Sequence, residues 1–247
     1  MKRLLDFRVI PRLDVKGGKV IKGIHLEGLR QVGIPQELAE KYYFDGADEL
    51  IFMDPVASLY GKNHLFEEVS CTSEKVFVPL TVGGGIRTID DVTMALASGA
   101  DKVAVNTAFH LRPKFIEEIA LTFGSQCCVC SIEAKRVGDN RWEAYMDNGR
   151  EPTGVSVNEW IKRVTELGAG ELLITSVDQE GTKRGFDLKL YEIARDNCSV
   201  PIIASGGAGS VEHLMQLRKQ GCVSGVAVAA ILHYNVASIQ NIKEVIT

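Results

Sequence analysis

Two glycine runs in this sequence stand where a protein can bind anions. Gly83-Gly84-Gly85 precedes a helix predicted to open at Thr88, and Gly206-Gly207-Ala208-Gly209 also lies between an apolar run and a predicted helix. Glycine lets the backbone approach an anion closely, and the free amides at a helix start donate hydrogen bonds to it. We expect Asn106-Thr107 to complete the first anion site and Ala229-Ala230 to complete the second. Two such sites across one mouth predict a long substrate with a phosphate at each end.

The elements that would position these glycines form a regular series. Short apolar runs rich in Val, Ile and Leu alternate with helix-like stretches along the chain. Near-continuous apolar strands are typical of a parallel sheet that is buried on both faces. Eight of them alternating with helices predict a closed (β/α)8 TIM barrel of the α/β class, as one domain over residues 1–247. The predicted strands are 8–13, 49–54, 77–82, 101–106, 128–133, 171–176, 200–205 and 224–229.

The second half of the chain repeats the first. Residues 78–85 match 200–207, and residues 46–51 match 168–173; both offsets are 122, since 200 − 78 = 122 and 168 − 46 = 122. The segment around Asp14 matches the segment around Glu133, at 133 − 14 = 119. A nearly common offset predicts two half-barrels related by an internal two-fold, which would place equivalent groups on opposite sides of one mouth.

Two stretches interrupt this rhythm after the first and fifth strands. Residues 134–153 contain a Gly-Asp-Asn turn between alternating residues, which predicts a small β-hairpin bordering the catalytic face. Residues 16–33 contain five glycines and predict a long loop. This loop is a candidate lid that closes over substrate, and a plain solvated connection is the alternative.

Composition excludes several classes of protein. The net charge of −4 argues against general nucleic-acid binding, which needs a basic face. The start, residues 1–6, has no signal-peptide core, and no apolar run of about 18 residues follows, so we expect a cytoplasmic protein without a membrane partner. No motif for a cofactor or a metal is present. The six cysteines are expected to be small core residues: Cys71, Cys127, Cys128, Cys130, Cys198 and Cys222.

Several motifs together resemble the HisF/HisA barrel family over nearly the whole chain, to about residue 234. They are Leu13-Asp14-Val15-Lys16, Gly83-Gly84-Gly85-Ile86, Gly99-Ala100-Asp101-Lys102-Val103, Thr122-Phe123-Gly124-Ser125-Gln126, Gly168-Ala169-Gly170-Glu171, Asp178-Gln179-Glu180-Gly181-Thr182 and Ala204-Ser205-Gly206-Gly207-Ala208-Gly209. The likeness is closer to the HisF type than to HisA, which isomerises a sugar and needs no ammonia.

The resemblance implies a specific reaction. HisF-type barrels are cyclase subunits of imidazole glycerol phosphate synthase and pair with a glutaminase subunit, HisH, that releases ammonia. The ammonia crosses the barrel and joins a bis-phosphorylated ribulosyl substrate, PRFAR, to give imidazole glycerol phosphate and AICAR. By position, Asp14 and Glu133 would be the general acid and base, and Lys22, Glu180 and Gly181 would contact substrate. Adding ammonia, losing water and breaking a C–N bond each move a proton, so two carboxyl groups of different pKa suit the chemistry.

The resemblance also assigns the other end of the barrel. Arg8, Glu49, Lys102 and Glu171 lie near strand N-termini, where two acids and two bases would satisfy one another. This ring would gate ammonia entry, or in the absence of a channel would merely plug the barrel. Asp101, beside it, matches a residue at the glutaminase contact.

Four positions depart from the HisF pattern. Glu133 and Glu180 replace aspartates, Arg12 replaces a small cysteine, and Ala230 replaces a serine that helps to hold one phosphate. Displacing a catalytic oxygen by about one bond length can cost roughly 10²-fold in rate. Two other functions therefore stay open: a HisF-like paralogue that serves ammonia delivery to a sugar amidotransferase in surface-polysaccharide synthesis, and a non-catalytic scaffold that docks a glutaminase.

Overall fold

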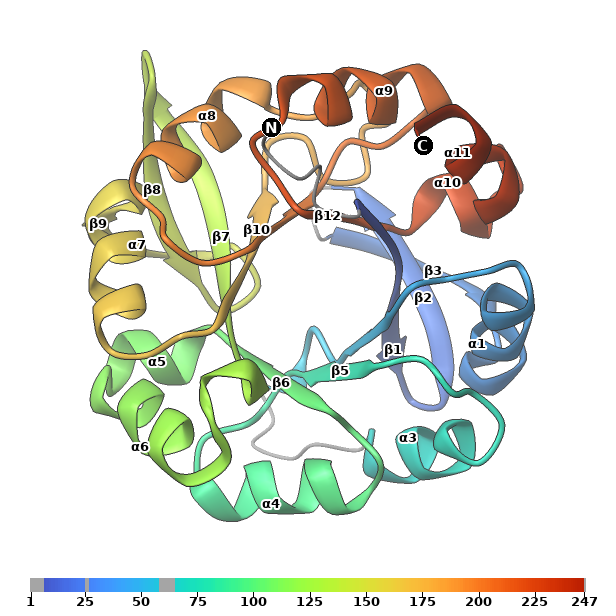
Figure 1. Ribbon diagram of the computed structural model, residues 1–247, viewed down its shortest axis with the longest axis horizontal. Helices are drawn as coiled ribbons and strands as arrows, with labels where there is room; N and C mark the ends of the chain where they lie inside the picture. Colours follow the sequence, from blue (N-terminus) through green and yellow to red (C-terminus); the bar gives the residue numbers. More distant parts are fainter. Residues whose placement is uncertain (1–6, 25–26, 58–64, 247) are drawn as a thin grey trace, which may run out of the picture.

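Eight parallel strands close into a barrel in the computed structural model, which describes residues 7–24, 27–57 and 65–246. Each strand pairs in parallel with its neighbours, and β7 pairs with β10 to complete the ring (Figure 1). All eight strand predictions are confirmed, with ends that shift by a few residues. Around the ring the barrel strands are β1 (Arg8–Lys16), β4 (Leu50–Met53), β5 (Leu80–Gly83), β6 (Lys102–Val105), β7 (Cys128–Gly138), β10 (Glu171–Ser176), β11 (Ile202–Ser205) and β12 (Gly225–Val228).

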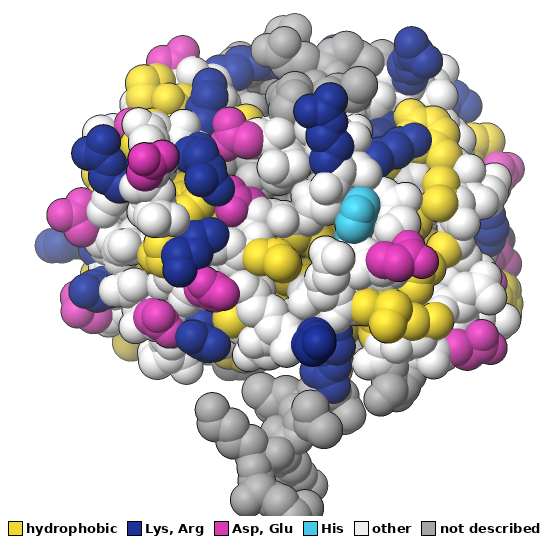
Figure 2. All heavy atoms as spheres, turned by 90° about the horizontal axis from the view of Figure 1, so that it is seen from above, with side chains coloured by type: hydrophobic (Ala, Val, Ile, Leu, Met, Phe, Trp, Pro, Cys, Tyr) yellow, Lys and Arg dark blue, Asp and Glu magenta, His cyan; other side chains and the backbone are white. Residues whose placement is uncertain are grey.

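Helices surround the barrel and cover its outer face (Figure 1). Their apolar sides pack on the strands, while their outer sides carry basic and acidic groups interspersed, as Figure 2 shows for one side of the molecule. The helices are α1 (Pro35–Phe44), α3 (Phe66–Ser73), α4 (Ile89–Ala97), α5 (Thr107–Leu111), α6 (Lys114–Phe123), α7 (Val157–Glu166), α8 (Leu188–Asp196), α9 (Val211–Gln220), α10 (Ala230–His233) and α11 (Ile239–Ile246), with a 3-10 turn at Ser125–Cys127. None of the helices in the described ranges is long and apolar enough to cross a membrane.

The strands bury two separate apolar cores. Alternate residues of a strand point to opposite faces, so Val9 and Leu13 of β1 join the large core under the helices, while Ile10 points into the barrel. The barrel interior is filled rather than hollow at this level. Its apolar layer consists of Ile10, Ile51, Met53, Ala104, Val129, Leu173, Ile203 and Ala227.

Backbone conformation bears out the internal repeat. Gly46 and Gly168, 122 residues apart, both have positive φ, at 92° and 104°. A second pair at that offset, Gly99 and Gly221, also has positive φ, at 102° and 69°. Each of these glycines lies between a helix and the next barrel strand, where only a residue without Cβ adopts such angles readily.

Both half-barrels carry an antiparallel extension after their first strand. β7 continues into β8 (Arg141–Met146) and β9 (Glu151–Ser156), so the hairpin predicted in residues 134–153 is confirmed and gains a third strand. In the other half, β1 continues into β2 (Lys19–Ile24) and β3 (Glu27–Gly33). The expectation of a long loop over residues 16–33 is therefore wrong, because most of this stretch pairs as two antiparallel strands that include three of its five glycines.

Cysteine placement needs one correction. Cys127, Cys128, Cys130 and Cys222 are buried as expected, and Cys198 is partly buried, but Cys71 is exposed on α3. It lies on the outward side of an amphipathic helix whose buried positions are Val69 and Thr72. Residues 1–6, on which the expectation of a cytoplasmic protein partly depended, lie outside the described residues.

Candidate active site

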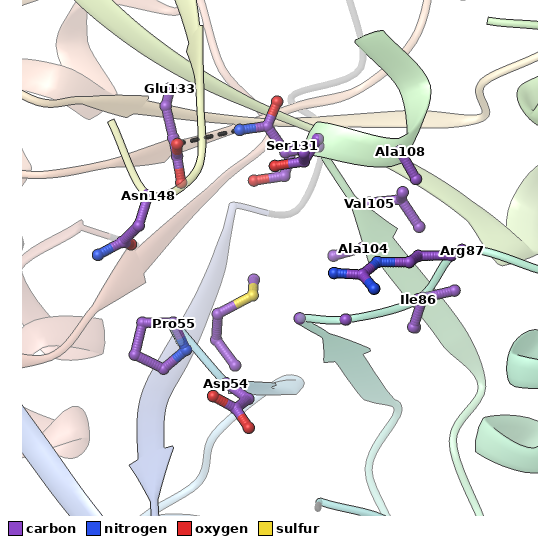
Figure 3. Close-up of a pocket in the computed structure, with 15 residues that line it drawn as sticks. Asp54, Pro55, Ile86, Arg87, Ala104, Val105, Ala108, Ser131, Glu133 and Asn148 are labelled. Carbon is purple, nitrogen blue, oxygen red and sulfur yellow. Dashed lines mark hydrogen bonds between the residues drawn. The ribbon is translucent and has the colours of Figure 1, made fainter. Parts of the chain in front are cut away.

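The first glycine run forms one anion-binding cradle at the strand C-termini, which we call cradle one. Gly84 has φ of 96°, and a Cβ there would meet the Asp54 carbonyl oxygen at 2.2 Å, so any side chain would push β5 off β4. The cavity beside it is small, about 60 Å³. Figure 3 shows Glu133 and Asn148 on one side of it and Ile86, Ala104 and Arg87 across from them. Its lining also includes Gly85, Asn106, Thr107 and Ser131.

The second run forms cradle two by the same geometry. Gly206 has φ of 96°, and a Cβ there would meet the Ser176 carbonyl oxygen at 2.7 Å. Positions 206 and 176 lie 122 residues after positions 84 and 54, respectively. Both cradles therefore bring a glycine against a backbone carbonyl at the C-terminal end of the neighbouring barrel strand. The cavity here is only about 20 Å³, and its lining includes Gly181, Gly207, Ala229 and Ala230.

Glu133, near the middle of β7, lies beside cradle one with one carboxyl oxygen held in place. The Asn106 side-chain amide donates to its Oε2 at 3.0 Å, and the Gly149 backbone N–H donates to the same atom at 2.6 Å. Both hydrogen bonds that the described residues make to this carboxyl therefore end on Oε2. Burial raises the pKa of Glu133 to about 7, although these donors and the Arg12 charge act in the opposite direction.

Asp14, on β1, has the opposite electrostatic setting. Arg12 lies two residues before Asp14 and therefore on the same inward face of the strand, and it donates from Nε to Asp14 Oδ1 at 2.8 Å. Burial alone would raise the pKa of Asp14, but Arg12 and Lys22 together bring it below its ordinary value. The Arg12 guanidinium also reaches across to β10, where Nη1 donates to Thr175 Oγ1 at 3.3 Å.

Lys22, on β2, extends into the barrel mouth. It is buried and forms an ion pair with Glu180, which is also buried and follows β10. Lys22 is therefore not a solvated surface side chain. Both residues line cradle two together with Arg12, which explains why that cavity is so small.

Comparison with known proteins places this chain in a family. Residues 8–238 match the family described as histidine biosynthesis protein. A protein of Legionella pneumophila named imidazole glycerol phosphate synthase subunit HisF is 58% identical over 207 residues, which cover 84% of this chain and 98% of that protein. A protein of the same name from Bacillus cereus (strain Q1) is 47% identical over 240 residues, covering 97% of this chain and 95% of the relative. The chain belongs to the HisF family.

The ring assigned by likeness to HisF proteins closes at the N-terminal end of the barrel. Arg8 donates to Glu49 at 2.6 Å and to Glu171 at 2.5 Å, and Lys102 donates to the same two carboxylates at 3.0 and 2.9 Å. Each of the four carboxylate oxygens thus accepts from one base. Asp101 is exposed beside this ring, at the end of the barrel opposite Asp14 and Glu133, and its carboxylate accepts from the Leu80 backbone N–H at 2.8 Å.

The structure adds residues to the HisF-type site that sequence reasoning missed. Asn148 and Gly149 belong to the turn between β8 and β9 and reach back to Glu133 and cradle one. Three successive residues of this turn have positive φ: Asp147 at 50°, Asn148 at 59° and Gly149 at 75°. The Asn-Gly pair was a turn signal in the sequence, but nothing in it revealed where the turn would dock. Asn106 and Thr107 were expected in the anion site; their side chains bond to Glu133 and Asp147, leaving the start of α5 to line the cavity.

Proposed function

We propose that this chain is the cyclase subunit of an imidazole glycerol phosphate synthase and acts in histidine biosynthesis. It takes ammonia from a glutaminase subunit, joins it to PRFAR, and forms imidazole glycerol phosphate and AICAR. The names of two relatives that match nearly their full length support this reaction. We infer that residues 1–247 act as one domain and that the protein works in the cytoplasm.

One observation supports the proposed chemistry. Two carboxyl groups, one with a lowered pKa and one with a raised pKa, lie between two glycine cradles. Asp14 has a lowered pKa and Glu133 a pKa of about 7, so near neutral pH one is a carboxylate while the other can exchange a proton. We assign general acid–base roles to this pair. The substrate's reacting carbon would lie between them.

The two cradles suit the two phosphates of the proposed substrate. In cradle one, the backbone of Gly84 and Gly85 and the start of α5 would donate to one phosphate. In cradle two, Gly181, Gly206, Gly207 and the amides at Ala229 and Ala230 would hold the other. Because Lys22 pairs with Glu180 at the lining of cradle two, we infer that Lys22 leaves Glu180 to meet the anion when substrate binds.

Ammonia would enter at the opposite end, from a glutaminase subunit. We assign the gate to Arg8, Glu49, Lys102 and Glu171, below the apolar layer of the barrel interior. Exposed Asp101 supports a partner contact there. Exposed aromatic side chains precede β4 and β5 at the same end: Phe44 is 72% and Phe77 is 76% exposed, and Tyr43 lies against both.

The proposal is tested by supplying PRFAR and an ammonium salt to the purified chain. We expect imidazole glycerol phosphate and AICAR to form without any glutaminase, and Asp14→Asn to abolish turnover while glutaminase binding persists. No consumption of PRFAR at high ammonium would reject the cyclase function. Activation of a glutaminase without any turnover would instead identify a docking scaffold.

A second candidate is favoured by Arg12. This side chain occupies the barrel interior where HisF proteins usually have a small cysteine, and together with Lys22 and Glu180 it nearly fills cradle two. Such a barrel suits a HisF-like paralogue that helps to deliver ammonia to a sugar amidotransferase in surface-polysaccharide synthesis. Neighbouring histidine genes would favour the first function, and neighbouring polysaccharide genes the second.

A further inference from the structure

The Arg12 charge acts on both carboxyl groups of the site, and its side chain contacts two barrel strands, β1 and β10, that lie three positions apart in the ring. It is only 5% exposed, and its guanidinium bonds to Asp14 on β1 and to Thr175 on β10. Thr175 on β10 is paired with Glu133 on β7. The Arg12 side chain therefore reaches the height in the barrel at which Glu133 is attached to its strand. A buried arginine with two fixed contacts is a rigid positive charge, since its guanidinium does not lose its proton.

We propose that Arg12 is a positioning residue that keeps Asp14 a permanent carboxylate and so leaves Glu133 as the one carboxyl that exchanges protons with substrate. This assignment rests on the proposed cyclase function. Glu133 then carries out the proton transfers, and Asp14 acts only as a fixed negative charge.

The geometry at Glu133 identifies the working atom. Asn106 and Gly149 both donate to Oε2, and an oxygen that accepts two hydrogen bonds is a poor place for a proton. The exchangeable proton therefore resides on Oε1. In the reaction, ammonia adds to the substrate carbonyl to give a carbinolamine, and Oε1–H protonates its hydroxyl group. The C–O bond breaks, water leaves with the bonding pair, and the resulting iminium nitrogen returns one proton to Oε1.

Asp14 has a complementary part in that step. As a fixed carboxylate it faces the positive charge that develops on the iminium nitrogen and stabilises it without any transfer. The charged groups around Asp14 are Arg12 on its own strand and Lys22 on β2, with the His233 ring facing it from α10. His233 is neutral near pH 7, because burial and Lys22 lower its pKa to about 4. Glu133 faces Arg12 and Asp147, whose charges act on it in opposite directions.

The first test is a titration of the carboxyl carbons by NMR without substrate, which stays valid even if the cyclase function is wrong. In the unmodified protein we expect Asp14 to titrate below its ordinary range. In Arg12→Gln we expect its pKa to rise by about 1–3 units, because a neighbouring cation is lost. An Asp14 that titrates at or above the ordinary value in the unmodified protein overturns the proposal, and this measurement needs no variant that has to fold.

The second test is the pH profile of ammonia-dependent PRFAR turnover. With Glu133 as the proton donor, kcat/KM falls as pH rises through about 7. In Arg12→Gln this limb of the profile, the fall in kcat/KM, should occur at a pH that is higher by roughly one unit, because the cation that favours ionised Glu133 is lost. Arg12→Lys keeps the charge, so its limb should stay in place while kcat falls with the loss of the Thr175 contact. A lower rate in Arg12→Gln at an unmoved limb would show a purely structural role and refute the assignment.

Arg112→Gln is the matched control. Arg112 is also paired with a carboxylate, Glu118, at 2.9 Å, but it is exposed on the outer layer. Its removal should change neither titration nor pH profile. Absence of turnover in the unmodified protein would count against the proposed function alone, while the titration would still decide the role of Arg12.

Discussion

The two ends of this barrel hold similar charges in different arrangements. At the N-terminal end, two acids and two bases form a closed ring in which each carboxylate oxygen accepts one hydrogen bond from Arg8 or Lys102. At the C-terminal end, Arg12 pairs with Asp14 and Lys22 pairs with Glu180, whereas a fifth charged residue, Glu133, forms no ion pair with any other residue that the structure describes. Burial without such a partner raises the pKa of Glu133 to about 7.

This difference separates charges that hold the fold from charges that can react. In the closed ring every carboxylate oxygen already accepts a hydrogen bond from a base, so these charges hold the end of the barrel together. An additional, partly buried carboxyl costs stability when it ionises, and for that reason it is ready to gain or lose a proton in the working range. Variants at each end can test whether the comparison holds.

Among the variants that test the difference between the two ends, Glu133→Gln should have the largest effect. The amide preserves shape and can still accept from Asn106 and Gly149, but it cannot exchange the proton, so kcat for PRFAR turnover should fall by about 10²–10⁴-fold. Steady-state kinetics with an ammonium salt measures the change. A loss smaller than about tenfold would remove Glu133 from proton transfer and place the reactive charge elsewhere.

Breaking the ring at the other end should cost stability instead of chemistry. Glu171→Gln leaves Arg8 and Lys102 sharing one carboxylate, and we expect the free energy of unfolding to fall by about 2–4 kcal/mol, since the two bases are only partly buried. Urea denaturation measures it, with exposed Glu118→Gln as the control at under about 1 kcal/mol. Ammonium-dependent turnover should survive in the folded fraction; loss of turnover would mean that the two ends are coupled.

The same Glu133→Gln variant should be more stable than the unmodified protein at alkaline pH. The folded-state pKa of Glu133 is raised from 4.5 to about 7, so its stabilising contribution is complete below about pH 4.5 and is lost as pH rises through 7. Glutamine has no such loss. We expect a gain of about 1–3 kcal/mol at about pH 8 that disappears near pH 4, measured as a difference in urea midpoints. Equal midpoints at both pH values would show that Glu133 ionises freely.

The smallest effect is expected in cradle two. Ala230→Ser adds a hydroxyl at the start of α10, where it can donate to a phosphate, and one such hydrogen bond contributes about 0.5–1.5 kcal/mol. The KM for PRFAR should therefore fall by roughly 2–10-fold with kcat unchanged. Ser131→Ala, which removes a hydroxyl beside cradle one, serves as the comparison. A raised KM in Ala230→Ser would indicate that this cradle does not hold a phosphate.

The sequence by itself determined the barrel and its two-fold repeat. Eight apolar runs at regular spacing and glycines at a common offset of 122 depend on local backbone preferences, which neighbouring residues specify. The pairing of Arg12 with Asp14 was also predictable, because residues two apart on a strand share a face.

Only the tertiary structure decided which groups of the site contact one another. Whether Lys22 met solvent or Glu180, 158 residues away, depended on how the β2–β3 hairpin folds over the barrel mouth. The contact of Gly149 with Glu133 likewise depended on the β8–β9 turn docking at cradle one, which no local pattern encodes. The physical reason is that a pKa responds to burial and to charges brought close by packing, so the opposite settings of Asp14 and Glu133 exist only once the barrel has closed.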